Sequence, residues 1–314
     1  MRPIAILGSG FGLYGYLPAL VACGQSIVLP ERYRARFDDR TELHEFDCHL
    51  HWAKDELSAL QMSSGAVLAL CPKMQSQWLA TCFDQSQLEV LFLEKPLAPN
   101  PATARELQLR LQQSHKVIRI AYLFRFLPWA KEIRACALRN SVSTLKLHWK
   151  FQAHHFSNDL ATWKREHDQG GGPIRFYGIH VVALLAEFGY SNVEWSSTRM
   201  DKQDTVYQWQ AVFSGNNLPV MEVDIDTASA DTEFSVVGES PAGSFTLIQQ
   251  SNPIAAENRP NKVGSVDGRV GTLASFCRSA WDDPIRLPEF YSHTIELWNQ
   301  LEQTGCNFPV QVVA

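Results

Sequence analysis

The sequence predicts two domains: an α/β domain with a doubly wound parallel sheet, and an α+β domain with a large, mostly antiparallel sheet. The chain has 314 residues, about twice the length of a usual single domain. Up to residue 122, short apolar runs alternate with helical segments, whereas beyond it long strands follow one another with few helices. We therefore expect the first domain to cover residues 1–122 and the second to cover residues 123–314.

The first domain is predicted from continuous apolar runs, which are typical of strands buried on both faces of a parallel sheet. Such runs occupy residues 3–7, 26–29, 66–70, 90–93 and 117–122. Helical segments lie between them, most clearly at residues 13–23, 75–83 and 102–113. This alternation predicts a doubly wound sheet, and such sheets bind ligands at the carboxyl ends of their strands.

The second domain is predicted from strict alternation of apolar and polar residues, which is typical of half-covered strands. Residues 143–152 place Leu145, Leu147, Trp149 and Phe151 on one face and polar side chains on the other. Further strands are expected at residues 193–200, 205–214, 219–228, 232–239 and 243–250, with a tight turn at 240–243. Helices are expected at residues 173–188, 269–281 and 287–303.

The composition excludes several classes of partner. The net charge is −5 and the basic residues are dispersed, whereas nucleic-acid binding needs a concentrated positive face. No apolar run reaches the length of a membrane span, and glycines interrupt the first run too early for a signal peptide. The seven cysteines form no C-x-x-C pair, which indicates reduced thiols in a cytoplasmic protein. No metal site is expected, because the histidines near residue 150 lack further ligands at a useful spacing.

A glycine-rich turn follows the first predicted strand and precedes a helix. Gly8 would permit a tight turn, and Gly10 would let the backbone approach a pyrophosphate at the positive end of the helix dipole. The pattern departs from G-x-G-x-x-G, because the third glycine would fall at Leu13. Since glycine also ends strands for conformational reasons, the prediction of a dinucleotide-binding (Rossmann) domain depends on the surrounding strand–helix alternation. The cofactor-binding candidates in this turn are Gly8, Ser9, Gly10, Phe11 and Gly12.

Glu31 follows the second predicted strand, at the place where an acid can bond the adenosine ribose hydroxyls. Such a carboxylate favours NAD over NADP. The neighbouring Arg32 and Arg34 could accept a ribose phosphate, which keeps NADP open. The alternative for Glu31 is an ordinary solvated carboxylate.

Two further segments carry the candidate chemistry. Glu94-Lys95-Pro96 follows the strand predicted at residues 90–93, so a lysine at the carboxyl edge of the sheet can reach a substrate oxygen. His180 lies two turns into the helix that begins after a run of three glycines, and an imidazole suits general acid–base catalysis near neutral pH. The alternatives are an exposed lysine without a role and a structural histidine.

Together these motifs resemble the glucose–fructose oxidoreductase, inositol dehydrogenase and MocA (Gfo/Idh/MocA) family. The resemblance extends over nearly the whole chain, with the motifs in the order and spacing of that family. The matching segments are Gly8–Gly12, Pro72, Glu94-Lys95-Pro96, Tyr122–Pro128, Trp163, Gly170–Gly172 and Gly178-Ile179-His180.

The resemblance implies hydride transfer between NAD or NADP and a carbinol or carbonyl carbon of a sugar, inositol or similar polyol. It implies that Lys95 binds the reacting oxygen and that His180 is the general acid or base. Besides the glycine turn, the expected cofactor contacts are Glu31, Arg32, Pro72, Glu94 and Lys95. The expected substrate contacts are Tyr122, Arg125 and Trp163. For Arg125 and Trp163 the alternatives are a structural ion pair and core packing.

The sequence departs from the family pattern at two positions. Family members commonly carry an aspartate four residues before the helix histidine, and here that position is Phe176. This removes the carboxylate that would orient His180, so we expect Tyr177 to assist or replace it as a catalytic proton relay. At Ser76 relatives often carry histidine, which leaves the details of the nicotinamide pocket open.

Two other functions and one partner follow from the residues. The same fold could reduce a non-sugar ketone, imine or tetrapyrrole, or could serve as a non-catalytic, cofactor-binding sensor or structural protein. The segment from Val206 to Phe213 places large apolar groups on both faces of its strand. An uncovered apolar face usually marks an interface, and the resemblance also implies assembly. We therefore expect a homodimer or homotetramer formed through the C-terminal sheet.

Overall fold

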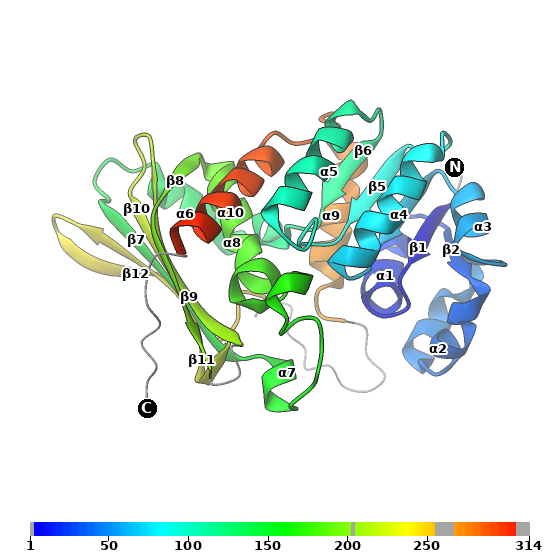
Figure 1. Ribbon diagram of the computed structural model, residues 1–314, viewed down its shortest axis with the longest axis horizontal. Helices are drawn as coiled ribbons and strands as arrows, with labels where there is room; N and C mark the ends of the chain where they lie inside the picture. The colour runs from blue at the N-terminus through cyan, green and yellow to red at the C-terminus, as the bar shows by residue number, and fades with distance from the viewer. Residues whose placement is uncertain (1–2, 202–204, 255–266, 306–314) are drawn as a thin grey trace. The chain divides into compact units, whose positions relative to one another are not determined.

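The structure of the protein is a computed structural model that describes residues 3–201, 205–254 and 267–305. These residues form two compact units, each with its own six-stranded sheet (Figure 1). The first unit contains the glycine turn, and the second contains the chain from Leu127 through the last strand.

The first unit is built on a parallel sheet, which confirms the predicted doubly wound fold. Its strand order is β3-β2-β1-β4-β5-β6, and every neighbouring pair is parallel. The order reverses between β1 and β4, and ligands of such sheets bind beside this reversal. The strands are β1 (Ile4–Leu7), β2 (Ile27–Pro30), β3 (Leu50–Ala53), β4 (Gly65–Leu68), β5 (Val90–Leu93) and β6 (Val117–Ile120).

Helices and short turns connect these strands. The helices are a π-helical turn η1 (Gly12–Tyr16), α1 (Leu17–Val21), α2 (Arg34–Asp38), α3 (Glu56–Gln61), α4 (Pro72–Asp84) and α5 (Pro101–Gln113). Short 3₁₀ turns lie at η2 (Glu31–Tyr33), η3 (Thr41–His49) and η4 (Leu123–Phe126).

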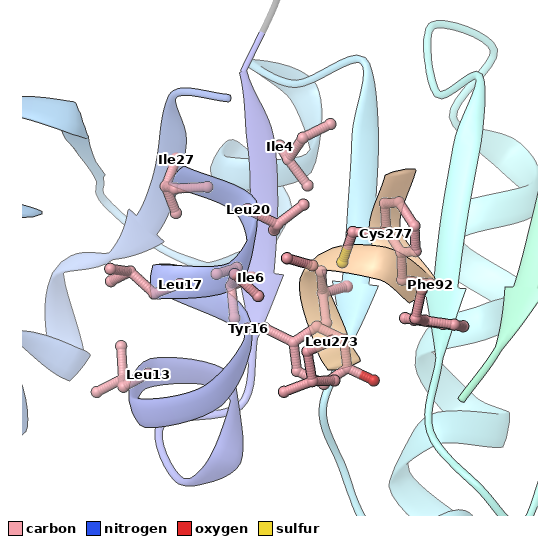
Figure 2. Close-up of a cluster of buried hydrophobic side chains, with 14 of the residues drawn as sticks. Ile4, Ile6, Leu13, Tyr16, Leu17, Leu20, Ile27, Phe92, Leu273 and Cys277 are labelled. Carbon is pink, nitrogen blue, oxygen red and sulfur yellow. The ribbon is translucent and has the colours of Figure 1, made fainter. Parts of the chain in front are cut away.

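Helix α9 (Val270–Asp282) completes the core of the first unit, although it lies far along the chain. Figure 2 shows Leu273 and Cys277 of α9 beside Tyr16 and Leu20 of the first helix, next to Phe92 of β5. These side chains are at most 1% exposed. The sequence prediction put this segment in the second domain, whereas it packs in the first unit. An amphipathic helix shows which of its faces is buried but not against which sheet, so its partner could not be predicted.

The second unit contains a mixed, mostly antiparallel sheet, as predicted, in the order β12-β11-β7-β10-β9-β8. One pair, β7 with β10, is parallel. The turn predicted at residues 240–243 is confirmed, because Ser240 pairs with Gly243 at the end of a hairpin. The strands are β7 (Thr144–Gln152), β8 (Tyr190–Met200), β9 (Val206–Gly215), β10 (Val220–Asp226), β11 (Ala228–Ser240) and β12 (Gly243–Gln250).

Helices cover one face of this sheet (Figure 1). A π-helical turn η6 (Pro173–Gly178) continues into α8 (Ile179–Phe188), and together they span the helix predicted at residues 173–188. Helix α10 (Phe290–Gly305) packs against α8 and β8. The remaining elements are α6 (Pro128–Ala137), α7 (His154–Ser157) and η5 (His167–Gln169).

The two faces of the second sheet differ in polarity. Trp209 and Phe213 are fully buried on the helix-covered face, so this face is not the uncovered apolar surface that the sequence predicted. On the other face Lys146 pairs with Glu239 at 2.8 Å, and Gln208 donates to Asp224 at 2.7 Å. The free face therefore carries ion pairs and hydrogen bonds, together with half-buried Val212 and Trp195, which lie opposite one another next to Glu222.

Two further findings concern helices and thiols. Among the residues that the structure describes, every helix is too short or too polar to cross a lipid bilayer. The six cysteines within the described ranges are free thiols, and Cys306 lies outside those ranges.

Candidate functional site

The glycine turn after β1 requires glycine at two positions for different reasons. Gly8 has φ +125°, and a Cβ there would collide with the carbonyl of Ala69. At Gly12 a Cβ would lie 2.8 Å from Cγ2 of Ile6, so the helix can approach the strand only because Gly12 has no side chain. Gly12 thus allows the close helix–strand packing expected of the third glycine, one position earlier than the usual pattern.

The same turn presents unpaired donors. The amides of Ser9, Gly10 and Phe11 have no hydrogen-bond acceptor among residues 3–201, 205–254 and 267–305. A Cβ added at Gly10 would meet no atom within 4 Å, so the backbone is open on that side. Free amides at the start of a helix, next to open space, fit a phosphate group. The residues present therefore fit the pyrophosphate of a dinucleotide.

Tyr33, which the sequence reasoning missed, ties the turn to the end of β2. Its hydroxyl accepts the amide proton of Gly8 at 3.0 Å and donates to Glu56 at 3.2 Å. Burial raises the pKa of this phenol, which keeps it a neutral donor and acceptor. A tyrosine three residues beyond a strand carries no signal in the sequence that would reveal this contact.

The predicted ribose contact, Glu31, lies exposed directly after β2 and is ion-paired. Arg34 donates to it from Nε at 2.6 Å and from Nη2 at 3.3 Å. This pairing lowers the pKa of the Glu31 carboxyl, so the group is anionic at neutral pH. Arg32 forms an ion pair with Glu56. Glu31 and Arg32 thus lie at the expected edge of the sheet, both with partners of their own.

Gln75 holds the turn that carries Lys95. Its fully buried side chain donates to the Glu94 carbonyl at 2.8 Å and to the Leu97 carbonyl at 3.2 Å, and it accepts the Glu94 amide proton at 2.6 Å. The Lys95–Pro96 peptide is cis, and Lys95 is half-buried. Gln75 follows Pro72, the first residue of α4. A buried glutamine inside a helix cannot be told from a surface one by its spacing, so this residue was missed.

The Glu94 carboxylate has a partner within the first unit. Tyr16 donates to its Oε1 at 2.7 Å. Burial and the neighbouring Glu94 raise the pKa of Tyr16 well above its usual value, so the phenol keeps its proton. The expected role of Glu94 in cofactor binding stays a prediction, and its observed role is to fix the Lys95 turn to the first helix.

Of the predicted substrate contacts, two lie in the first unit. Tyr122 is 2% exposed, and Arg125 is half-buried with its guanidinium 5.2 Å from the centre of the Phe126 ring. Trp163 lies in the second unit and contacts Phe176 edge to face at 5.3 Å. Their contact with a substrate stays a prediction.

The glycine run before α8 forms a compact turn in the second unit. Gly170 and Gly172 have φ values of +91° and +87°, which favour glycine. A Cβ at Gly171 would collide with the carbonyl oxygens of Trp163 and Lys164. The run therefore packs under the Trp163 segment, and this explains why the two motifs occur together.

His180 is placed by the next glycine. A Cβ at Gly178 would lie 2.6 Å from the Trp209 ring, so its absence lets the start of α8 pack directly on β9. His180 is the second residue of α8 and is 9% exposed. The sequence prediction of its helix is confirmed.

Aromatic side chains occupy the position of the usual aspartate. The Phe176 ring contacts Tyr177 at 4.7 Å, and Tyr177 contacts Phe151 at 4.9 Å and Trp149 at 5.9 Å. Burial among these rings raises the pKa of the Tyr177 phenol far above its usual value, so it is protonated at neutral pH. Its relay role stays a prediction, and the structure shows packing as its clearest function.

His155 stacks on the same cluster and was not assigned a role from the sequence. Its ring lies 6.2 Å from that of Tyr177 and is 4% exposed. Burial, together with the nearby Arg165 and Lys164, lowers the pKa of His155 to about 4. The imidazole is therefore neutral at pH 7.

A buried ion pair supports the segment between the glycine run and His180. Arg175, which is 5% exposed, donates to both carboxylate oxygens of Glu302 in α10, at 2.6 and 2.7 Å. It also donates to the carbonyls of His167 at 2.5 Å and Pro99 at 2.9 Å. Pro99 comes four residues after Lys95 in the chain. An arginine beside a helix start looks like a surface residue in sequence, so this network was missed.

Comparison with solved structures places these motifs on a known fold. A protein of gentamicin A biosynthesis in complex with NAD matches with a TM-score of 0.71 and 16% identity, over 98% of this chain and 94% of its own. A 3-ketoreductase from Actinomadura kijaniata with NADP and TDP-benzene matches with a TM-score of 0.70 and 11% identity, over 97% and 98%. The chain has their fold.

A third similar structure is an inositol dehydrogenase, one of the activities for which the family resembled by the motifs is named. It is a myo-inositol dehydrogenase from Lactobacillus casei in complex with NAD(H) and myo-inositol, with a TM-score of 0.69, 12% identity and coverage of 100% and 98%. The resemblance to the glucose–fructose oxidoreductase, inositol dehydrogenase and MocA group is thus confirmed at the level of the fold. No protein-family model matches the sequence, and neither does any curated protein sequence.

Proposed function

We propose that the protein is an NAD(P)-dependent oxidoreductase that acts on a carbinol or carbonyl carbon of a sugar or sugar derivative. The observation that carries the proposal is the glycine turn at the reversal point of a doubly wound sheet, where three amides are unpaired and the backbone at Gly10 borders open space. A bound nicotinamide would supply or accept the hydride. Solved proteins of this fold hold NAD, NADP and myo-inositol.

The catalytic groups in this proposal are Lys95 and His180. Lys95 leaves the carboxyl end of β5 on a turn fixed by Gln75, and it would bind the reacting oxygen and stabilise negative charge there. His180, at the start of α8, would accept the hydroxyl proton in oxidation and return it in reduction. Lys95 belongs to the first unit and His180 to the second, so their convergence on one substrate is part of the proposal.

The proposal also includes the substrate contacts, the proton relay, the two domains and the assembly. Arg125, Tyr122 and Trp163 would line the substrate site, with the Trp163 ring as an apolar surface for a sugar ring. Tyr177 would relay a proton to His180. Residues 1–122 with α9, and the rest of residues 123–314, would be the two domains, in a cytoplasmic homo-oligomer assembled through the second sheet. A mass by light scattering above that of one chain at micromolar concentration would support the assembly, and a monomer mass would contradict it.

The test is nicotinamide absorbance during incubation with a panel of polyols, sugars and sugar nucleotides. We expect turnover on at least one of them, and Lys95→Met should lower kcat/KM by about 10²- to 10⁴-fold. Lys73→Met, an exposed lysine on α4, is the matched control and should keep full activity.

Two results would contradict the proposal. Cofactor binding without turnover on any carbinol or carbonyl would favour a non-catalytic sensor. Turnover confined to non-sugar ketones or imines would favour the other reductase function. No observation in the described part of the chain favours either alternative.

A further inference from the structure

We infer that Arg269, at the start of α9, is a positioning residue for the glycine turn, and that it acts on dinucleotide affinity by holding the ring of Phe11. The inference rests on the proposed function, because it adds to the dinucleotide site a group from a helix far along the chain.

The first observation is how the Phe11 ring is enclosed. Its amide is one of the three unpaired donors of the turn. Its ring lies edge to face against those of Tyr14 and Tyr16, with ring centres 5.4 Å apart in both pairs. A Cβ at Gly15 would collide with the Phe11 ring, so glycine makes room for it at this position. The ring is therefore packed against the first turn of the helix that follows it.

The second observation is the Arg269 guanidinium over this ring. Its central carbon lies 4.2 Å from the centre of the Phe11 ring, which is a cation–π contact. Its Nε and Nη2 each donate to one oxygen of Asp267 at 2.8 Å. Burial would raise the pKa of Asp267, but hydrogen bonds from Arg269 outweigh it and lower the pKa. An ionised carboxylate, 4% exposed, thus fixes the orientation of the guanidinium.

The third observation is that the first unit itself holds Arg269 in place. Helix α9 belongs to this unit and packs on the first helix through buried side chains that include Leu273 and Cys277 (Figure 2). A contact from such a fixed helix restricts the Phe11 side chain and, through it, the backbone that carries the unpaired amides. Donors that are held in place before binding lose less entropy when a pyrophosphate binds.

A direct contact between Arg269 and the pyrophosphate would also raise affinity, but the paired edge of its guanidinium is occupied by Asp267. The two roles differ in how they depend on Phe11. If Arg269 acts through the ring, removal of the ring also removes the effect of Arg269. A direct contact would be independent of the ring, so the losses would add.

The experiment measures dissociation constants of NAD⁺, NADP⁺ and ADP by calorimetry, with Tm as the check on folding. Arg269→Lys keeps a charge opposite Asp267 but lacks the planar face, and Phe11→Leu keeps an apolar side chain without the ring. Each should weaken all three ligands by the same factor, about 3- to 30-fold, because the turn binds the diphosphate that they share. The double variant should bind no more weakly than Phe11→Leu alone.

Two further variants guard the result. Asp267→Asn with Arg269→Met removes both charges, so it leaves no buried unpaired charge and no cation over the ring; it should match Phe11→Leu in affinity. Arg278→Gln alters an exposed arginine of the same helix and should change no dissociation constant.

Hydrogen exchange gives a readout that a merely structural arginine would not move. Coupling between two sites is reciprocal, so NAD⁺ should slow amide exchange at the start of α9 in the wild-type chain. In Arg269→Lys this slowing should be lost.

Contrary results separate the inference from the proposed function. Additive losses in the double variant, unchanged affinity in both folded Arg269 variants, or exchange that is slowed equally in Arg269→Lys overturns the inference and leaves the proposed function standing. Binding of neither dinucleotide by the folded wild-type chain removes the two together.

Discussion

Removing the Glu302 carboxylate should destabilise the second unit more than most single changes. Glu302→Ala leaves Arg175 buried with only two carbonyl acceptors, and it also removes the acceptor of the Trp298 indole, which donates to Glu302 at 2.7 Å. Breaking a buried ion pair by removing one partner costs about 3–5 kcal/mol. Because the side chain of Glu302 is 19% exposed, we expect the lower end, about 3 kcal/mol.

The assay is unfolding in urea, followed by tryptophan fluorescence, together with thermal melting. For a unit of this size, about 3 kcal/mol corresponds to a fall in Tm of about 6–12 °C. Glu302→Gln keeps the volume and one acceptor, so it should cost about 1–2 kcal/mol. The double variant Arg175→Met with Glu302→Leu removes both charges and should recover part of the loss, because it leaves no buried unpaired charge.

Two results would refute this reasoning. A Glu302→Ala chain within about 0.5 kcal/mol of the wild type would show that the pair is solvated or absent. A double variant less stable than Glu302→Ala alone would show that Arg175 stabilises the unit through the His167 and Pro99 carbonyls and not through the ion pair.

The remaining predictions concern the turn, the lysine segment and a buried histidine. Gly10→Val should lower dinucleotide affinity at least about tenfold in calorimetry with an unchanged Tm, because a Cβ there meets nothing within 4 Å; an unchanged affinity would contradict the site. Gln75→Leu should lower kcat about 10- to 100-fold, since it releases the Glu94 turn; an unchanged kcat would remove its positioning role. Unfolding should become easier as pH falls from 6.5 towards about 4, because the pKa of His155 is lowered to about 4 and the unfolded chain takes up the proton first. His155→Phe should reduce this slope in urea titrations at several pH values, and an unaltered slope would assign it to other groups.

The sequence predicted strands well where their burial is uniform. Residues 90–93 are a strand within the same bounds in the structure, because a strand buried on both faces is continuously apolar. Strand β3 was missed, since it lies at the sheet edge with His51 exposed and Leu50 half-buried. Such an edge strand needs no apolar run, and nothing local distinguishes it from a loop.

The candidate site was predicted where glycine is required and missed where polar groups are buried. Gly8 and Gly172 have positive φ values, a conformational requirement that sequence patterns record directly. Gln75 and Arg175 are buried by contacts with residues far along the chain. Their side chains could equally be solvated, so only the tertiary structure reveals their roles.

The measurement that tests the central claim most directly is a crystal structure of the protein with an oxidised dinucleotide and a polyol substrate. We expect pyrophosphate oxygens within hydrogen-bond distance of the Ser9, Gly10 and Phe11 amides. We also expect the Lys95 ammonium and the His180 imidazole both to contact the same substrate oxygen beside the nicotinamide. A dinucleotide bound elsewhere, or a substrate reached by only one of these two side chains, would contradict it.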